Sequence, residues 1–422
     1  MLAHIDGDSF FASIEQSVKP HLKGKPVVTG KERNIVAAAS IEAKKLGITR
    51  GVTLWDAKKM CPELVVLPTD YETVSLFSKR MYDIIRRYTP VVEEYSVDEA
   101  FADLSGLRRY HHASYEQIAA KIQNDIHAEL GITVTLGIAP TKTLCKIATD
   151  KGKPAGLVSI HRSRIDDALV DVAIENVWNI GPATAALLRK FGMRTALQFK
   201  QRPEEHIQKL LTKPGMQTWQ ELNGMQTIGF EEEKTSYKSI GKSKTFTPPS
   251  NNKEFIFAQL MKNIENACMK ARRYHQGAKS ITIYLRTKEF RGHGMEGTVE
   301  RVTAYPNELV DAVRTMFEHI WKPGYYRATG VFLANLQPLN PMQPTLFENP
   351  ATLVKYTKLY GAIDELREHY GKHSVHLAAS LPAQSFQHVS ARGDMPIRRA
   401  TTLKGETKRK RLPIPMLQVK LR

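Results

Sequence analysis

The sequence predicts an α+β protein built from several domains, and three observations support this prediction. The chain has 422 residues, whereas a domain holds roughly 150, so about three domains are expected. Short apolar runs alternate with helical patterns over the first 160 residues, as they do in a domain that mixes strands and helices. Residues 166–235 carry helical patterns alone, and residues 239–336 alternate again.

The first domain begins with a predicted buried strand at residues 2–5, which acidic residues and then a helix with apolar positions 11, 14 and 18 follow. The spacing of apolar residues indicates the further elements. Strands are expected at 25–30, 35–39, 91–96, 100–104 and 132–138, and helices at 72–88 and 114–130. Pro140 and Thr141 mark the start of a helix that carries Lys142 and Lys146.

The last folded part is predicted to be a small separate domain. Its expected strands are 239–247, 280–289, 295–304 and 327–335, with helices at 252–275 and 306–321. The order β-α-β-β-α-β is that of the ferredoxin-like split unit. Residues 236–250, which include Pro248 and Pro249, resemble a linker into this domain. Residues 337–422 are expected to form a basic tail, which is either solvated and flexible or in contact with phosphates or an acidic partner.

The charge of the chain favours a polyanionic partner. There are 61 Lys and Arg against 43 Asp and Glu, a formal net charge of +18, which suits nucleic acid or an anionic membrane surface. No stretch approaches about 18 consecutive apolar residues, so no transmembrane helix is expected, and the N-terminus lacks the pattern of a signal peptide. Three scattered cysteines form no zinc or disulfide pattern. We therefore expect a soluble cytosolic protein whose partner is nucleic acid.

Two acidic clusters each follow a predicted strand. Asp6-Gly7-Asp8 ends the first strand, and Asp98-Glu99 lies in the turn of a hairpin at 91–104. Carboxylates packed together raise each other's pKa unless a cation neutralises them, and grouped oxygen ligands suit Mg²⁺. Two such ions clamp the attacking and leaving oxygens of a phosphoryl displacement. Any one of these acids alone is more simply an ordinary turn acid, but two clusters in a basic protein favour a metal centre.

Basic residues in the same domain complete a candidate phosphate site. Lys44 and Lys45 follow the strand expected at 35–39, and Lys142 and Lys146 lie one helical turn apart. Lysines near strand ends and helix starts bind triphosphates well, although a lone lysine pair is more often part of a solvated face. The chain has no GxxxxGK[ST] motif, so side chains and metal would have to hold the phosphates.

Two further features suit a nucleic-acid backbone. Ile180-Gly181-Pro182-Ala183 lies between helical patterns, and such a hairpin presents backbone N–H groups to a DNA phosphate without reading sequence, although the motif alone is weak. Basic residues would line one face or the edges of the small domain's sheet, but each one alone is as easily unrelated surface charge. They are Lys279, Arg286, Lys288, Arg291, Arg301 and Arg327.

Four segments resemble motifs of the Y-family translesion DNA polymerases, the DinB- and UmuC-like class. In family order they are DGDSFFASIE at 6–15, EAKKLG at 42–47, YSVDEAF at 95–101 and GIAPTKTLCK at 137–146. The resemblance extends over residues 1–340 and more loosely to the tail. It implies a right-hand polymerase with a palm within 1–165, fingers inserted at about 20–71, a helical thumb with a helix-hairpin-helix at 166–235 and a little finger at 239–336.

The resemblance also implies roles for single residues. The catalytic ligands of two Mg²⁺ ions would be Asp6, Asp98 and Glu99, with the main-chain carbonyl of Gly7. The nucleotide would lie against Phe10, Phe11, Lys44 and Lys146. The two aromatic residues cannot both face the core, and family position makes Phe11 the steric gate that excludes the 2′-hydroxyl of a ribonucleotide. DNA contacts would come from Ile180, Gly181, Ala183, Arg286 and Lys288.

The chain departs from the polymerase IV pattern at two places. Ile41 and Lys44 stand where many polymerase IV-like members carry Tyr and Arg, so a hydroxyl contact is lost and a point charge replaces a bidentate fork. UmuC-like members are more similar at these positions, and the tail after residue 348 resembles extensions in UmuC-like and Gram-positive plasmid-type members. Before it, the peptide Gln343-Pro344-Thr345-Leu346-Phe347 resembles the QxxLF segment by which bacterial polymerases bind the sliding clamp.

The predicted function is that of a template-directed, Mg²⁺-dependent DNA polymerase that inserts nucleotides opposite damaged bases. Its substrates would be primer-template DNA and deoxynucleoside triphosphates, and its further partners a bacterial sliding clamp and accessory damage-response subunits. We expect it in the cytoplasm at the nucleoid and away from membranes. Two alternatives stay open at this point. A palm-type nucleotide cyclase uses similar carboxylates but needs neither the helical hairpin nor the +18 charge, and a non-catalytic DNA-binding scaffold needs no metal acids.

Overall fold

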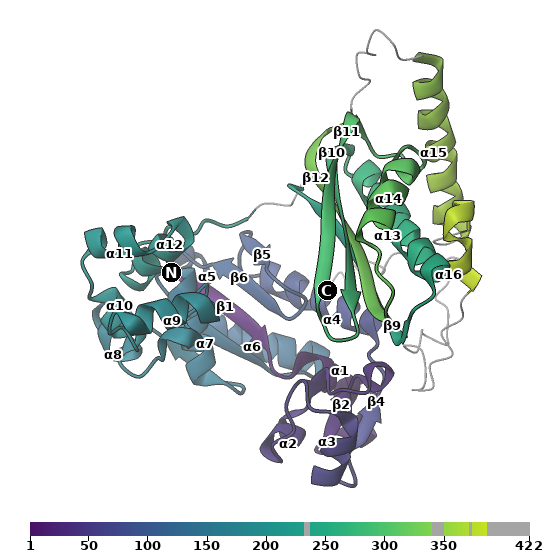
Figure 1. The fold of residues 1–422 in the computed structure, drawn as a ribbon. Coiled ribbons are helices and arrows are strands. Elements are labelled where there is room, and N and C mark those ends of the chain that lie inside the picture. The colour runs from purple at the N-terminus through teal and green to yellow at the C-terminus, as the bar shows by residue number, and fades with distance from the viewer. Residues whose placement is uncertain (232–236, 340–349, 371–373, 386–422) are drawn as a thin grey trace. The chain divides into compact units, whose positions relative to one another are not determined.

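The computed structural model in Figure 1 describes residues 1–231, 237–339, 350–370 and 374–385. The described residues form two compact units, one up to residue 231 and one from residue 237 onward. Among them, no helix is long and apolar enough to cross a membrane. The predicted clamp-binding peptide at 343–347 lies outside the described residues, as does the basic end of the tail.

The first unit is centred on a five-stranded sheet with the order β5-β6-β1-β7-β8. The central strand β1 (Leu2–Gly7) pairs antiparallel with β6 (Glu99–Asp103) and with β7 (Val134–Ala139). The edge strands are β5 (Val92–Glu94) and β8 (Leu157–Ser159). All residues of β1 and β7 are buried, because helices cover both faces of the sheet.

Successive side chains of β1 point to opposite faces of the sheet. Ala3 and Ile5 pack against α1 (Phe10–Val18), α4 (Tyr71–Arg86) and α6 (Tyr115–Leu130), which bury apolar stripes on one face. Leu2 lies on the other face with the apolar residues of α7 (Lys142–Gly152). The short helix α5 (Leu107–His111) connects β6 to α6.

Two smaller parts belong to the same unit. A three-stranded sheet of order β3-β2-β4 has its own apolar core within residues 20–71. Its elements are β2 (Val27–Thr29), β3 (Ala38–Ala39), α2 (Ile41–Lys45), α3 (Leu54–Met60) and β4 (Val65–Leu67). The helical part consists of α8 (Ile165–Leu169), α9 (Pro182–Lys190), α10 (Ala196–Lys200), α11 (Glu204–Leu210) and α12 (Lys213–Leu222). It shares one apolar core with α7.

The second unit has the predicted β-α-β-β-α-β order of elements. They are β9 (Ile240–Ser250), α13 (Lys253–Arg273), β10 (Gln276–Thr287), β11 (Gly292–Thr303), α14 (Pro306–Ile320) and β12 (Tyr326–Pro338). The sheet order is β11-β10-β12-β9, so the first strand of the unit lies at an edge beside the last strand. In Figure 1 both helices cover the same face of this sheet, where they share one core with β10 and β12. The unit thus has the ferredoxin-like order of elements along the chain, while the order of its strands across the sheet is β11-β10-β12-β9.

Part of the tail packs onto this unit. Helix α15 (Pro350–Tyr370) is held by Arg272 of α13, whose guanidinium donates two hydrogen bonds of 2.7 Å to Asp364. Helix α16 (Leu381–Ser385) follows a turn in which Ser380 donates to the buried Glu265 at 2.9 Å. The described part of the predicted tail is therefore folded against α13 up to residue 385.

Three expectations about elements need correction. The strand expected at 239–247 is confirmed as β9, but it extends to Ser250, so the linker expected at 236–250 is wrong from residue 240 onward. Pro248 and Pro249 are tolerated there because β9 is an edge strand with a register shift near its end. The strand expected at 35–39 is reduced to β3, with Ile35 in an isolated bridge to Thr53. Glu99 is the first residue of β6 and not part of the turn, because it pairs with Asp6.

Candidate active site

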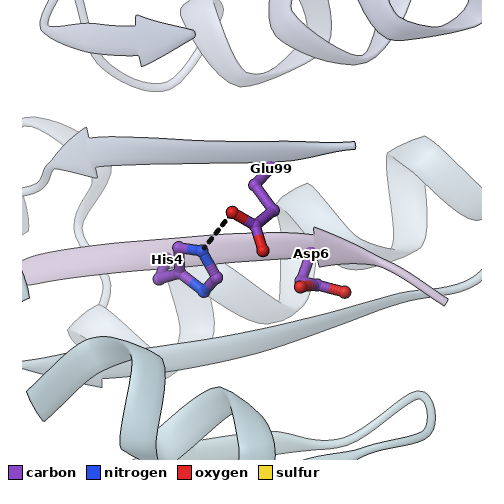
Figure 2. A group of neighbouring side chains, drawn as sticks. All are labelled: His4, Asp6 and Glu99. Atoms are coloured by element: carbon purple, nitrogen blue, oxygen red, sulfur yellow. Dashed lines mark ion pairs between the residues drawn. The ribbon is translucent and has the colours of Figure 1, made fainter. Parts of the chain in front are cut away.

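The sheet register brings the predicted metal ligands together. Asp6 on β1 stands directly opposite Glu99 on β6, and directly opposed residues of an antiparallel pair share one face. His4 lies two residues before Asp6 and therefore on the same face. One ligand atom of each of these three side chains lies within 4.8 Å of the others. Figure 2 shows the three side chains as neighbours. The backbone N–H of Gly7 donates to the carbonyl of Asp98 at 2.8 Å, which places Asp98 at the end of β1.

The two opposed carboxyl groups differ in their affinity for protons. Burial raises the pKa of Asp6 to about 7, against the opposing charge of Lys153. Burial also tends to raise the pKa of Glu99, but its contacts with His4 and Lys146 outweigh this effect and lower that pKa to about 2. Burial lowers the pKa of His4, which favours the neutral imidazole. The pair thus combines one carboxylate with one carboxyl group that titrates near neutral pH.

Two lysines neutralise these carboxyl groups. Lys153 Nζ lies 3.1 Å from Asp6 Oδ2, and Lys146 Nζ lies 3.0 Å from Glu99 Oε2. Lys153 offsets only part of the burial cost of Asp6, whereas Lys146 helps to keep Glu99 ionised. The hard oxygen donors of Asp6, Glu99 and the neighbouring Asp98 suit a divalent cation such as Mg²⁺. The donor set fits the metal that the sequence predicts.

Asp8, the second acid of the first cluster, accepts hydrogen bonds from other parts of the unit. Its Oδ1 accepts a hydrogen bond from Thr135 at 2.7 Å, and its Oδ2 accepts one from the backbone N–H of Ala155 at 2.9 Å. The side chain is 5 % exposed. Asp8 therefore connects the start of α1 to β7 and to the segment after α7, and it also lies on the wall of the cavity described next.

A cavity of about 720 Å³ opens over the acids. Asp6, Asp98 and Glu99 lie on its wall, as do both predicted aromatic residues. Phe10 is 3 % exposed and packs into the core of the sheet, whereas Phe11 is half-buried, with its ring edge-on to Tyr71 at 5.9 Å. A side chain at residue 7 would collide with the ring of Phe10, so glycine is required there.

The basic side of the cavity comes mainly from residues 31–50. Lys44 and Lys45 line the cavity, as the candidate phosphate site predicts, together with three basic residues and one aromatic residue that the sequence did not single out. These are Arg33, Arg50, Lys153 and Tyr71. Lys146 is not among the lining residues, although its ammonium group contacts Glu99, which is. No periodicity marks Arg33 or Lys153, because each belongs to an irregular or short segment that only the tertiary fold directs toward the cavity.

The expectation that Lys142 contributes to a phosphate site is wrong. Its side chain is 1 % exposed and its Nζ donates to Glu93 at 2.5 Å and to the carbonyl of Gly229 at 2.7 Å. Phe101 and Phe230 lie on either side, with ring centroids 5.0 and 4.6 Å from Nζ. Lys142 and Lys146 are one turn apart on α7. The side chain of Lys142 is buried against Glu93, so only Lys146 reaches the candidate metal ligand Glu99.

The predicted DNA contacts lie on two separate units. Ile180 is buried in the core of the helical part, whereas Gly181 and Ala183 are exposed at the N-terminus of α9, where backbone N–H groups are accessible. On the second unit, Arg286 and Lys288 are exposed. Arg286 shares the uncovered face of the sheet with Tyr284, whose ring stacks on Phe332 at 5.9 Å. Their role in binding DNA stays a prediction.

Comparison with known proteins places this site in a family. The impB/mucB/samB family matches residues 5–150, and the C-terminal domain of the same family matches residues 237–346. DNA polymerase IV of Desulfatibacillum aliphaticivorans is 30 % identical over 383 residues, which cover 90 % of this chain and 96 % of that protein. Protein ImpB of Salmonella typhimurium is 30 % identical over 404 residues, 92 % of this chain and 95 % of that protein.

The solved structures show the same fold. A Y-family DNA polymerase chimera of Dbh and Dpo4 superposes with a TM-score of 0.66, covers 79 % of this chain and 98 % of its own, and is 24 % identical. The fold and the relatives together place the chain in the class of Y-family DNA polymerases, as the four sequence segments indicated. The chain belongs to the impB/mucB/samB family.

Proposed function

We propose that this protein is a DNA-directed DNA polymerase that performs translesion synthesis. The relatives named DNA polymerase IV and the Y-family fold support this activity. A solved insertion ternary complex of Dbh DNA polymerase has the same fold, which supports DNA and a nucleotide as substrates. The observation that carries the proposal is the register of β1 and β6, which opposes Asp6 and Glu99 on the wall of a cavity with a basic rim.

Different residues of the site have different roles in nucleotidyl transfer. Asp6, Asp98, Glu99 and the carbonyl of Gly7 would hold two Mg²⁺ ions, which when bound stabilise the charge that develops on the reacting oxygens. Lys44 and its basic neighbours on the cavity rim neutralise a triphosphate, and Phe11 presents its ring to the sugar. Catalysis by these groups rests on positioning and electrostatics, because phosphoryl transfer needs little covalent participation from the protein.

The parts of the chain correspond to the parts of a right-hand polymerase. We assign the five-stranded sheet with its helices to the palm, the three-stranded sheet within 20–71 to the fingers, the helical part at 166–231 to the thumb and the unit at 237–338 to the little finger. The exposed backbone at Gly181 and Ala183 suits a DNA phosphate. Arg286 and the stacked pair of Tyr284 and Phe332 suit a nucleic-acid backbone on the second unit.

Further partners follow from the same proposal. Gln343, Leu346 and Phe347 match a clamp-binding peptide, in which two apolar anchors fill a pocket and the amide donates a hydrogen bond. We infer a bacterial sliding clamp and accessory damage-response subunits as partners. The cytoplasm at the nucleoid is the location where a polymerase of this kind meets its template.

Primer extension on a primed template, with and without Mg²⁺, tests the proposed function. We expect template-directed extension that requires the metal, and Glu99→Gln or Asp98→Ala should abolish it while primer-template binding persists, because the charge that attracts DNA lies elsewhere. Glu94→Gln is the matched control, since Glu94 belongs to the same hairpin, pairs with Arg86 and does not line the cavity. Conversion of nucleotides without a template would indicate a cyclase, and binding without extension would indicate a scaffold.

A further inference from the structure

Lys146 lies in an aromatic cluster that connects two parts of the first unit. The ring centroid of Tyr95 lies 5.2 Å from Lys146 Nζ, and that of Trp178 lies 5.9 Å away. Tyr95 precedes Asp98 and Glu99 in the palm hairpin, whereas Trp178 precedes the exposed Gly181 in the helical part. The ammonium group thus lies near two aromatic residues from segments that are far apart in sequence.

The two rings are held in a defined arrangement. They meet edge-to-face, with centroids 5.6 Å apart and an interplanar angle of 85°. The indole Nε1 of Trp178 donates a hydrogen bond of 3.2 Å to the hydroxyl of Tyr95. Both rings also contact Phe101, which is fully buried, at 5.6 and 5.8 Å. The two rings therefore have contacts of their own with each other and with Phe101, in addition to those with Lys146.

Such an arrangement restricts where the Lys146 ammonium group can be. A cation within about 6 Å of an aromatic face is attracted to it, most strongly to tryptophan, and a lysine side chain is otherwise flexible. The Lys146 ammonium group contacts the rings of Tyr95 and Trp178 and donates a hydrogen bond of 3.0 Å to Glu99. Loss of the indole would leave the lysine with its charge but with less restraint on its position.

We propose that Trp178 is a positioning residue that acts through Lys146 on the affinity for the incoming nucleotide. This inference rests on the proposed function and on the nucleotide contact of Lys146 that the resemblance of the segment at 137–146 implies. It also gives a physical connection between two sites, because Trp178 is only three residues from Gly181, where the DNA backbone is proposed to bind. The hairpin that receives the DNA and the lysine that receives the nucleotide are then held by the same indole ring.

The test is a double-mutant cycle between Trp178 and Lys146 in the full-length protein. Trp178→Leu should raise the KM for a matched deoxynucleotide about three- to tenfold, the range expected for one partly buried cation–π contact, and should change kcat less. Nucleotide binding to the complex with a dideoxy-terminated primer should weaken by the same factor. In the Lys146→Met background, Trp178→Leu should add less than about twofold. Trp178→Phe retains an aromatic face and should stay within about twofold of the parent.

Trp55→Leu is the matched control, because Lys59 also lies over that indole ring, at 3.2 Å, but Trp55 is 64 % exposed and does not line the cavity. Tyr95→Leu is a second variant at a position 43 % exposed and should show the same dependence on Lys146, so an unfolded Trp178→Leu would not end the test. Equal losses from Trp178→Leu in both backgrounds, or none in a folded protein, would overturn the inference. Failure of the parent protein to extend primers would instead refute the proposed function.

Discussion

Truncation of Phe11 to alanine should relax the selection against ribonucleotides while the fold persists. The ring of Phe11 lines the cavity, is half-buried and has Tyr71 as its aromatic neighbour at 5.9 Å. A steric conflict with a 2′-hydroxyl in a packed site costs about 3 kcal/mol, and its removal corresponds to about a hundredfold gain in relative ribonucleotide insertion. Because the side chain is only partly buried, its loss should lower the free energy of unfolding by about 1–2 kcal/mol.

The neighbouring Phe10 is the matched control. It is 3 % exposed and packs in the core of the sheet, so Phe10→Ala should lower the free energy of unfolding by about 3–5 kcal/mol and depress both substrates together. Steady-state insertion of matched deoxy- and ribonucleotides, with a melting curve for each variant, separates the two residues. If Phe11→Ala reduced both insertions equally and melted as early as Phe10→Ala, Phe11 would be a core residue and the reasoning would be refuted.

Three further outcomes are expected. Because the pKa of Asp6 is raised to about 7, Mg²⁺ must displace a proton from this side chain below that pH. The half-saturating Mg²⁺ concentration for extension should therefore rise about fivefold between pH 7 and 6, and a constant requirement would contradict this. Lys142→Met leaves Glu93 buried without its cation and should lower the free energy of unfolding of the first unit by about 3–5 kcal/mol, measured by urea denaturation followed by tryptophan fluorescence, and Glu93→Leu in the same chain should recover most of this loss. Leu346→Ala with Phe347→Ala should abolish clamp-stimulated synthesis and preserve basal synthesis, and unchanged clamp binding in a pull-down would exclude the peptide.

Much of the fold follows from local patterns in the sequence. The helix expected at 114–130 is α6 (Tyr115–Leu130), because Ser114 and Gln117 form a capping box at its start and Gly131 takes the left-handed conformation at its end. The alternation of the second unit predicts each of its strands and helices within a few residues. The position of the acids at strand ends is equally local in origin, since a short strand ends where its polar residues begin.

What the sequence by itself determined is thus the set of elements, the family and the acids that belong at one site. Only the tertiary structure decides which groups each charged side chain contacts. Lys142 and Lys146 have the same residue type and helical spacing, yet one is buried against Glu93 and the other lies beside Glu99, because the depth of α7 in the fold differs along the helix. Likewise, the pairing of Asp6 with Glu99, the engagement of Asp8 by Thr135 and the edge position of β9 depend on strand register and order. Register is fixed by contacts between residues far apart in the chain, which a local pattern does not record.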